Sequence, residues 1–242
     1  MLVTPEEILQ NKSAVASLID HTLLRPEATK LEINRLCDDA RANSFACVCV
    51  NPHWVQTALR RLQGSDVRVC TVIGFPLGAN DARTKLTEAG VALAQGAEEL
   101  DMVQNIGALR SGDFHIVHKE IADLADVAHG SGAILKVILE TCLLTDAEKV
   151  TACQLAMQAK ADFVKTSTGF SKSGATVADV KLMRQTVGPD MGVKASGGIR
   201  TFEALREMLL AGANRIGTSS GISILYEMEQ EVSSPATETG AY

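Results

Sequence analysis

The sequence lacks the features that would assign it to a membrane, nucleic-acid-binding or disulfide-rich class. It has 6 prolines among 242 residues and no apolar run of the roughly 18 residues needed to cross a bilayer. Its 23 basic and 29 acidic residues give a formal net charge of −6 without a Lys/Arg block, so nucleic acid is not an expected partner. Residues 1–10 lack a signal-peptide core.

Cysteine pairs and histidine clusters are also missing. The six cysteines form no Cys-x-x-Cys pair. Cys47 and Cys49 face the same side of a predicted strand, roughly 6.5–7 Å apart, which is poor disulfide geometry. A reducing cytoplasm is therefore expected. Only His115 and His118 share a helical face, without an acidic partner at ligand spacing, so no metal site is predicted.

What the sequence does contain is an alternation of short apolar runs and longer helical patterns. The apolar runs predict eight strands, several of them apolar throughout, as in parallel strands that are covered on both faces. Their ranges are Ser17–His21, Ala46–Val50, Val67–Gly74, Glu99–Asn105, Leu135–Glu140, Asp162–Ser167, Gly192–Ser196 and Arg215–Thr218. No Gly-x-Gly-x-x-Gly follows an early strand, which argues against a doubly wound sheet. A single α/β domain, a (β/α)8 TIM barrel, is predicted.

Helix signals fill the intervals between these strands. Thr145 and Glu148 have the spacing of a capping box, and Thr201 precedes an apolar stripe. Thr4 and Pro5 predict an extra helix before the first strand. Gly96, Gly132 and Gly212 lie where left-handed caps are needed. We predict a barrel over residues 1–232 and a flexible tail over residues 233–242.

Charged residues interrupt three otherwise apolar strands. Lys165, Asp101 and Lys194 are expected at the carboxyl ends of the barrel strands, where the chemistry of such barrels collects. A second cation and partial desolvation both lower the pKa of a lysine, so part of the Lys165 amine is expected to be neutral and nucleophilic near pH 7. Asp101 would transfer protons, and Asp20 would orient Lys194. The alternatives are a lysine that reaches solvent, or an ion-pair network that fixes strand register.

Two glycine-containing segments after the last two strands predict an anion site. Ser196-Gly197-Gly198 lets backbone N–H groups approach a ligand, and Gly217–Gly221 leads into the last helix. Barrels commonly hold phosphate at this position. Ordinary tight turns and a serine N-cap would explain either segment alone.

The chain resembles the deoxyribose-phosphate aldolases, class I lyases with the (β/α)8 fold. Matching segments run in the family's order through most of the sequence. The most specific are Phe163-Val-Lys-Thr-Ser-Thr-Gly-Phe170 and Val193-Lys-Ala-Ser-Gly-Gly-Ile-Arg-Thr201. The resemblance implies reversible cleavage of 2-deoxy-D-ribose 5-phosphate to D-glyceraldehyde 3-phosphate and acetaldehyde through a lysine Schiff base, without a metal or other cofactor. It also implies a homodimer.

The resemblance also assigns roles to individual residues. Lys165 would be the Schiff-base lysine, Asp101 the proton-transfer carboxylate, and Lys194 the cation that tunes Lys165. The substrate- and phosphate-binding positions would be Thr22, Thr168, Gly169, Gly197, Gly198, Ser219 and Ser220. Two auxiliary candidates depart from the rest: Lys172 stands in a loop that differs from the family pattern, and Tyr242 ends the chain.

Three alternatives remain at this point. The enzyme could accept another aldehyde donor or an unphosphorylated acceptor. The chain could be a phosphosugar-binding or regulatory barrel that has lost catalysis, although the retention of Asp101, Lys165 and Lys194 together argues against this. A metal-dependent aldolase is disfavoured by the lack of a histidine cluster.

Overall fold

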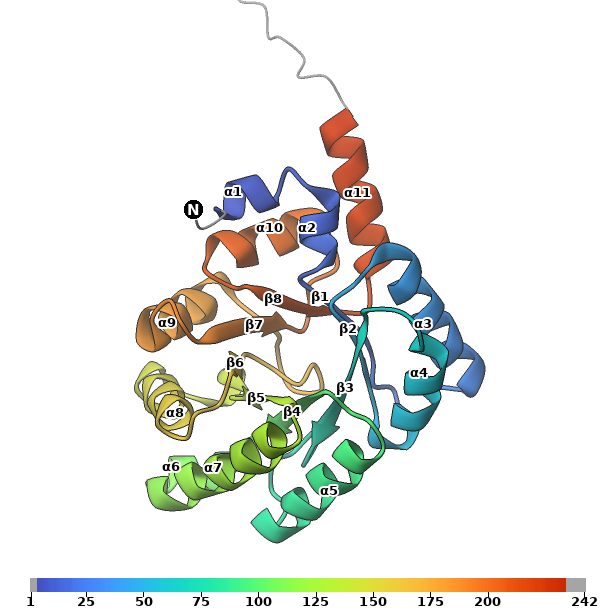
Figure 1. Cartoon of the computed structure of the whole chain (residues 1–242). Helices are drawn as coiled ribbons and strands as arrows, with labels where there is room; N and C mark the ends of the chain where they lie inside the picture. Colours follow the sequence, from blue (N-terminus) through green and yellow to red (C-terminus); the bar gives the residue numbers. More distant parts are fainter. Residues whose placement is uncertain (1–3, 234–242) are drawn as a thin grey trace, which may run out of the picture.

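A computed structural model describes residues 4–233, in which eight parallel strands close into a barrel (Figure 1). Each strand pairs with its neighbours in sequence, and β8 returns to pair with β1. The strands are β1 (Ile19–Leu23), β2 (Cys47–Val50), β3 (Arg68–Ile73), β4 (Glu99–Val103), β5 (Ile134–Ile138), β6 (Phe163–Lys165), β7 (Gly192–Ser196) and β8 (Arg215–Thr218). The predicted TIM barrel is confirmed.

Helices form a ring around the outside of this barrel, as Figure 1 shows. The longer ones are α3 (Lys30–Asn43), α4 (Val55–Leu62), α5 (Ala82–Ala94), α7 (Phe114–Gly130), α8 (Asp146–Gln158), α9 (Val177–Val187), α10 (Phe202–Leu210) and α11 (Gly221–Ser233). Short helices are α1 (Pro5–Ile8), α2 (Lys12–Ala16), α6 (Ile106–Arg110), and the 3-10 turns η1 (Pro52–Trp54) and η2 (Thr141–Leu143). None of the helices in residues 4–233 has the length and hydropathy of a membrane span.

The burial of the strand residues explains why the sheet closes and why helices cover its outer face. All residues of β2, β4 and β7 are buried, with apolar side chains such as Val48, Leu100 and Val193 among them. Burial of one such side chain stabilises the fold by about 1.5–3 kcal/mol. Both faces of the sheet are therefore in contact with protein, which a closed barrel inside a helical ring provides.

The predicted caps agree with the structure. The side chains of Thr145 and Thr201 accept backbone N–H groups at the starts of α8 and α10, and α8 has the complete capping box with Glu148. Gly96, Gly132 and Gly212 all have positive φ. These signals are local, which is why the sequence reveals them.

The two ends of the chain differ from the prediction in detail. Thr4 opens α1 with a capping box, but the chain forms two short helices, α1 and α2, before β1 rather than one. At the other end α11 continues through Ser233, the first residue of the predicted tail. Residues 234–242, including Tyr242, lie outside the described residues, so the tail stays a prediction.

Candidate active site

A cavity of about 430 Å³ opens at the carboxyl ends of the strands. Its walls come from the ends of β1, β6, β7 and β8 and from the loops that follow these strands. Lys165, the charged residue at the end of β6, lines the cavity. Six of the seven predicted substrate-binding residues also line it, namely Thr22, Thr168, Gly169, Gly197, Gly198 and Ser219. The topology therefore brings together residues that are up to nearly two hundred positions apart in the sequence.

Lys165, Asp101 and Lys194 form one contact cluster at the bottom of this cavity. The Nζ atoms of Lys165 and Lys194 each lie 2.7 Å from Oδ2 of Asp101. Lys165, the last residue of β6, is 3% exposed, whereas Asp101 and Lys194 are fully buried beneath it. Lys194 also forms an ion pair with Asp20, the contact that the sequence analysis predicted. Lys165 is thus the amine of this cluster that a ligand in the cavity can reach.

The buried groups of the cluster hold their charges strongly. Burial opposes ionisation of Asp101, but Lys136, Lys165 and Lys194 outweigh it and hold the pKa of Asp101 well below its usual range. Burial alone would lower the pKa of Lys194, yet the carboxylates of Asp101 and Asp20 raise it well above the usual value. Asp101 is therefore an anion and Lys194 a cation at neutral pH.

A second layer of charged residues below this cluster was missed in the sequence analysis. Lys136 on β5 lies 2.9 Å from Oδ1 of Asp101 and 2.5 Å from Oε2 of Glu99. Arg215 on β8 binds both carboxylate oxygens of Glu99, at 2.6 and 2.7 Å, and also contacts Asp20. The signal was present, because Lys136 interrupts an apolar strand in the same way as Lys165 and Lys194.

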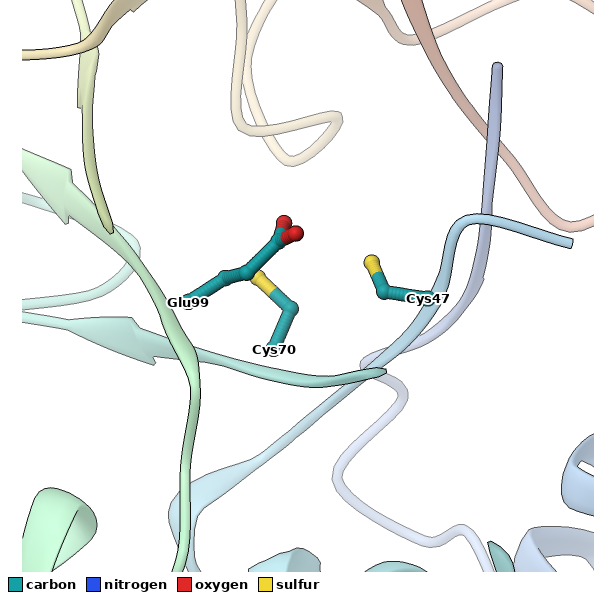
Figure 2. A group of neighbouring side chains, drawn as sticks. All are labelled: Cys47, Cys70 and Glu99. Carbon is teal, nitrogen blue, oxygen red and sulfur yellow. The ribbon is translucent and has the colours of Figure 1, made fainter. Parts of the chain in front are cut away.

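Cysteine side chains border this layer on the side of β2 and β3. Figure 2 shows Cys47, Cys70 and Glu99 pointing toward one another from β2, β3 and β4. Their sulfur and oxygen atoms lie within 4.8 Å of one another, close enough for a shared metal ion. Both oxygens of Glu99, however, already accept hydrogen bonds from the Arg215 guanidinium, and one of them also pairs with Lys136. The donor set fits packing and ion pairing better than a metal.

The loop after β7 has the backbone geometry of an anion-binding turn. Gly197 and Gly198 have φ values of +89° and +82°, a left-handed region that strongly favours glycine. A Cβ atom at Gly197 would lie 2.9 Å from the Cα of Gly174, so the loop after β6 packs directly on this turn. Ala175 donates its N–H to the carbonyls of Ser196 and Gly197, at 3.1 and 3.0 Å.

Glu140 connects the loop after β6 to the end of β5. Its carboxylate accepts hydrogen bonds from the Thr168 hydroxyl and from the Thr168 N–H, the latter at 3.3 Å. Glu140 is buried and adopts φ +56°, which is uncommon for a residue other than glycine. With this backbone conformation the Glu140 carboxylate contacts the loop after β6. Its hydrogen bonds hold Thr168, and with it the adjacent Gly169, in place.

Two of the remaining predicted residues, Ser220 and Lys172, lie outside the cavity lining. Ser220 precedes α11, and its N–H donates to the Thr218 hydroxyl at 2.9 Å. Lys172 is exposed in the loop after β6. Neither residue lines the cavity. Tyr242 is outside the described residues. The roles of these three residues stay predictions.

Comparison with known proteins identifies the relatives of this chain. Residues 14–228 match the model of a family described as DeoC/LacD family aldolase. A deoxyribose-phosphate aldolase of Geobacillus sp. (strain WCH70) is 58% identical over 211 residues, which cover 87% of this chain and 94% of the relative. The corresponding aldolase of Caldanaerobacter subterraneus subsp. tengcongensis is 53% identical over 231 residues, covering 95% of this chain and 99% of the relative.

A solved structure gives the same result. The deoxyribose phosphate aldolase of Aeropyrum pernix, described as tetrameric, superimposes with a TM-score of 0.84 at 35% identity. The superposition covers 93% of this chain and 98% of that chain. A family match over most of the sequence, relatives above 50% identity and a shared barrel all agree: the chain belongs to the DeoC/LacD aldolase family.

Proposed function

We propose that this chain catalyses the reversible cleavage of 2-deoxy-D-ribose 5-phosphate to D-glyceraldehyde 3-phosphate and acetaldehyde, through a Schiff base on Lys165. The observation that carries the proposal is the position of Lys165, whose Nζ sits at the bottom of the cavity, 2.7 Å from Oδ2 of Asp101. The names of the relatives, deoxyribose-phosphate aldolases, support the substrate.

The charges of the cluster favour Lys165 as the nucleophile. Three carboxylates, those of Asp20, Glu99 and Asp101, face four basic groups at the cluster, and Glu99 also pairs with a fifth, the exposed Arg68, at 3.7 Å. Lys165 contacts one carboxylate, whereas Lys136, Lys194 and Arg215 each contact at least two. Of these four bases, Lys165 therefore has the fewest carboxylate contacts, and it is also the one that lines the cavity.

In the cleavage direction, the free amine of Lys165 attacks the C1 aldehyde, and loss of water together with uptake of one proton gives a protonated imine. The C3 hydroxyl then gives up its proton to water, the C2–C3 bond breaks, and its electron pair moves to the iminium to form an enamine. Glyceraldehyde 3-phosphate leaves, C2 accepts a proton, and water releases acetaldehyde. Asp101 and Lys194 lie next to the imine nitrogen, where they exchange protons with it through water.

The turn at Gly197 and Gly198, together with Ser219, is proposed to bind the phosphate group. The left-handed backbone of the two glycines and the exposed Ser219 after β8 support this, because all three line the cavity on the side of β7 and β8. Thr22, Thr168 and Gly169 are proposed to contact the sugar. Ser220 and Lys172 are proposed to assist at the phosphate end, and Tyr242 to protonate the enamine.

The assembly and location of the enzyme are also part of the proposal. We propose a cytoplasmic homodimer that needs no metal or other cofactor. The tetramer described for the Aeropyrum pernix relative is the competing assembly. Light scattering of the purified protein would distinguish the two.

Borohydride trapping tests the function directly. The protein is incubated with acetaldehyde, reduced with borohydride, digested, and mapped by mass spectrometry. We expect one ethyl group on Lys165 and none on Lys194 or Lys136. Lys165→Ala should abolish both the trapping and the cleavage of 2-deoxyribose 5-phosphate. Modification of another lysine, or full activity in Lys165→Ala, would contradict the proposal.

A further inference from the structure

Ser196, the last residue of β7, carries a hydroxyl that the protein leaves without a partner. The residue is 6% exposed and lines the cavity together with Lys165. A buried hydroxyl without a hydrogen bond destabilises the free protein. A hydroxyl that is buried, has no partner in the protein and lies at the wall of a binding cavity is suited to form a hydrogen bond with a polar atom of the ligand.

The backbone of Ser196 is rigidly held. Its N–H donates to the Thr166 hydroxyl at 3.1 Å, and its carbonyl accepts from that same hydroxyl at 3.1 Å. Its side chain lies against Gly217 of β8, where a Cβ atom would come within 2.3 Å of Ser196 Oγ. Glycine at position 217 therefore leaves the space that this hydroxyl occupies.

The neighbouring buried hydroxyls of the cavity wall are already engaged. Thr168 donates to Glu140, and Thr218 donates to the carbonyl of Ile199 at 2.6 Å. Both also accept a backbone N–H, from Phe170 and Ser220 respectively. Among the buried hydroxyls that line the cavity in residues 4–233, that of Ser196 is the one free to act as both donor and acceptor.

The order of residues along β7 indicates which ligand atom Ser196 meets. Lys194 lies beside Asp101 at the imine end of the cavity, Ser196 follows on the same face of the strand, and Gly197 begins the proposed phosphate turn. In the substrate, the C3 oxygen lies toward the imine, and C4 with its hydroxyl lies between C3 and the phosphate-bearing C5. We propose that Ser196 Oγ hydrogen-bonds to the C4 hydroxyl and selects acceptor aldehydes that carry it. This inference rests on the proposed function.

The test compares two substrates and two variants. One substrate is 2-deoxyribose 5-phosphate, and the other is its analogue without the C4 hydroxyl. We expect Ser196→Ala to lower kcat/KM for 2-deoxyribose 5-phosphate about tenfold, the value of one hydrogen bond. For the analogue, Ser196→Ala and the unaltered protein should have the same kcat/KM. Ser167→Ala is the matched control, because Ser167 also has a buried, unpartnered hydroxyl but does not line the cavity. It should match the unaltered protein on both substrates.

One further measurement separates this inference from the proposed function. Acetaldehyde has no C4, so Ser196→Ala should still be trapped on Lys165 by borohydride to the full extent; failure of trapping in the unaltered protein would instead refute the proposed function. If Ser196→Ala does not fold, Ser196→Gly removes the same hydroxyl. Equal losses on both substrates, or no loss on either, would overturn the role of Ser196.

Discussion

The Nζ atoms of Lys165 and Lys194 lie at the same distance, 2.7 Å, from a single oxygen of Asp101. One carboxylate oxygen therefore contacts two amines, that of Lys165 at the cavity and that of Lys194 buried beneath it. Because Lys194 is also paired with Asp20, it keeps its proton more firmly than a lysine with one carboxylate contact. The arrangement places a fixed positive charge next to the proposed nucleophile.

Removal of that fixed charge should suppress catalysis. In Lys194→Leu, Asp101 loses one of the two lysine contacts on its Oδ2 atom, and the site of the proposed imine loses the fixed positive charge of Lys194. We expect kcat to fall at least about 100-fold, measured as the initial rate of acetaldehyde release. Lys194→Arg keeps the cation and should recover part of the loss. Equal inactivity of the Leu and Arg variants would show that size, rather than charge, matters at this position.

Acid should destabilise the fold through Asp101. Its pKa is lower in the folded protein than in the unfolded chain, where the ordinary value is about 3.9. The stabilisation is complete above that value and is lost progressively as the pH falls below it, toward the lowered pKa of the folded state. Urea unfolding between pH 7 and pH 2 would measure this loss. Asp101→Asn should be less stable at pH 7 and less sensitive to acid; an unchanged acid dependence would contradict the assignment.

A methyl group at Gly197 should weaken phosphate binding. Gly197→Ala introduces strain at φ +89° and a Cβ atom 2.9 Å from Gly174 Cα, which displaces the proposed phosphate turn. We expect KM for 2-deoxyribose 5-phosphate to rise about tenfold, with a smaller change for unphosphorylated deoxyribose. Gly188→Ala is the control, since Gly188 has φ +72° and open space around it. A similar rise in KM for Gly188→Ala would point to general strain.

Metal removal should leave the activity intact. The proposed chemistry uses an amine, and the carboxylate oxygens of Glu99 near Cys47 and Cys70 are already bound by Arg215. We expect the same kcat and KM before and after dialysis against a chelator. Loss of activity that zinc restores would refute the metal-free mechanism and would direct attention to the cysteine cluster in Figure 2.

Some features of the site were predictable because they depend on local sequence. Lys165, Lys194 and Asp101 each interrupt an apolar strand, and the glycines after β7 predict a turn. Other features escaped prediction. Lys136 shows the same pattern as Lys165, but no local signal says that its ammonium group reaches Asp101 on the neighbouring strand. Glu99 and Arg215 lie at strand starts, where a charged residue is ordinarily exposed.

By itself, the sequence determined the alternation of strands and helices, the caps of Thr145 and Thr201, and the positions of charge within apolar strands. These follow from hydrophobic periodicity and from hydrogen bonds within a few residues. Only the tertiary structure decided that one oxygen of Asp101 faces two lysines, and that the Ser196 hydroxyl has space against Gly217. Such contacts depend on barrel closure and strand register. Both are set by many weak interactions between residues far apart in the sequence.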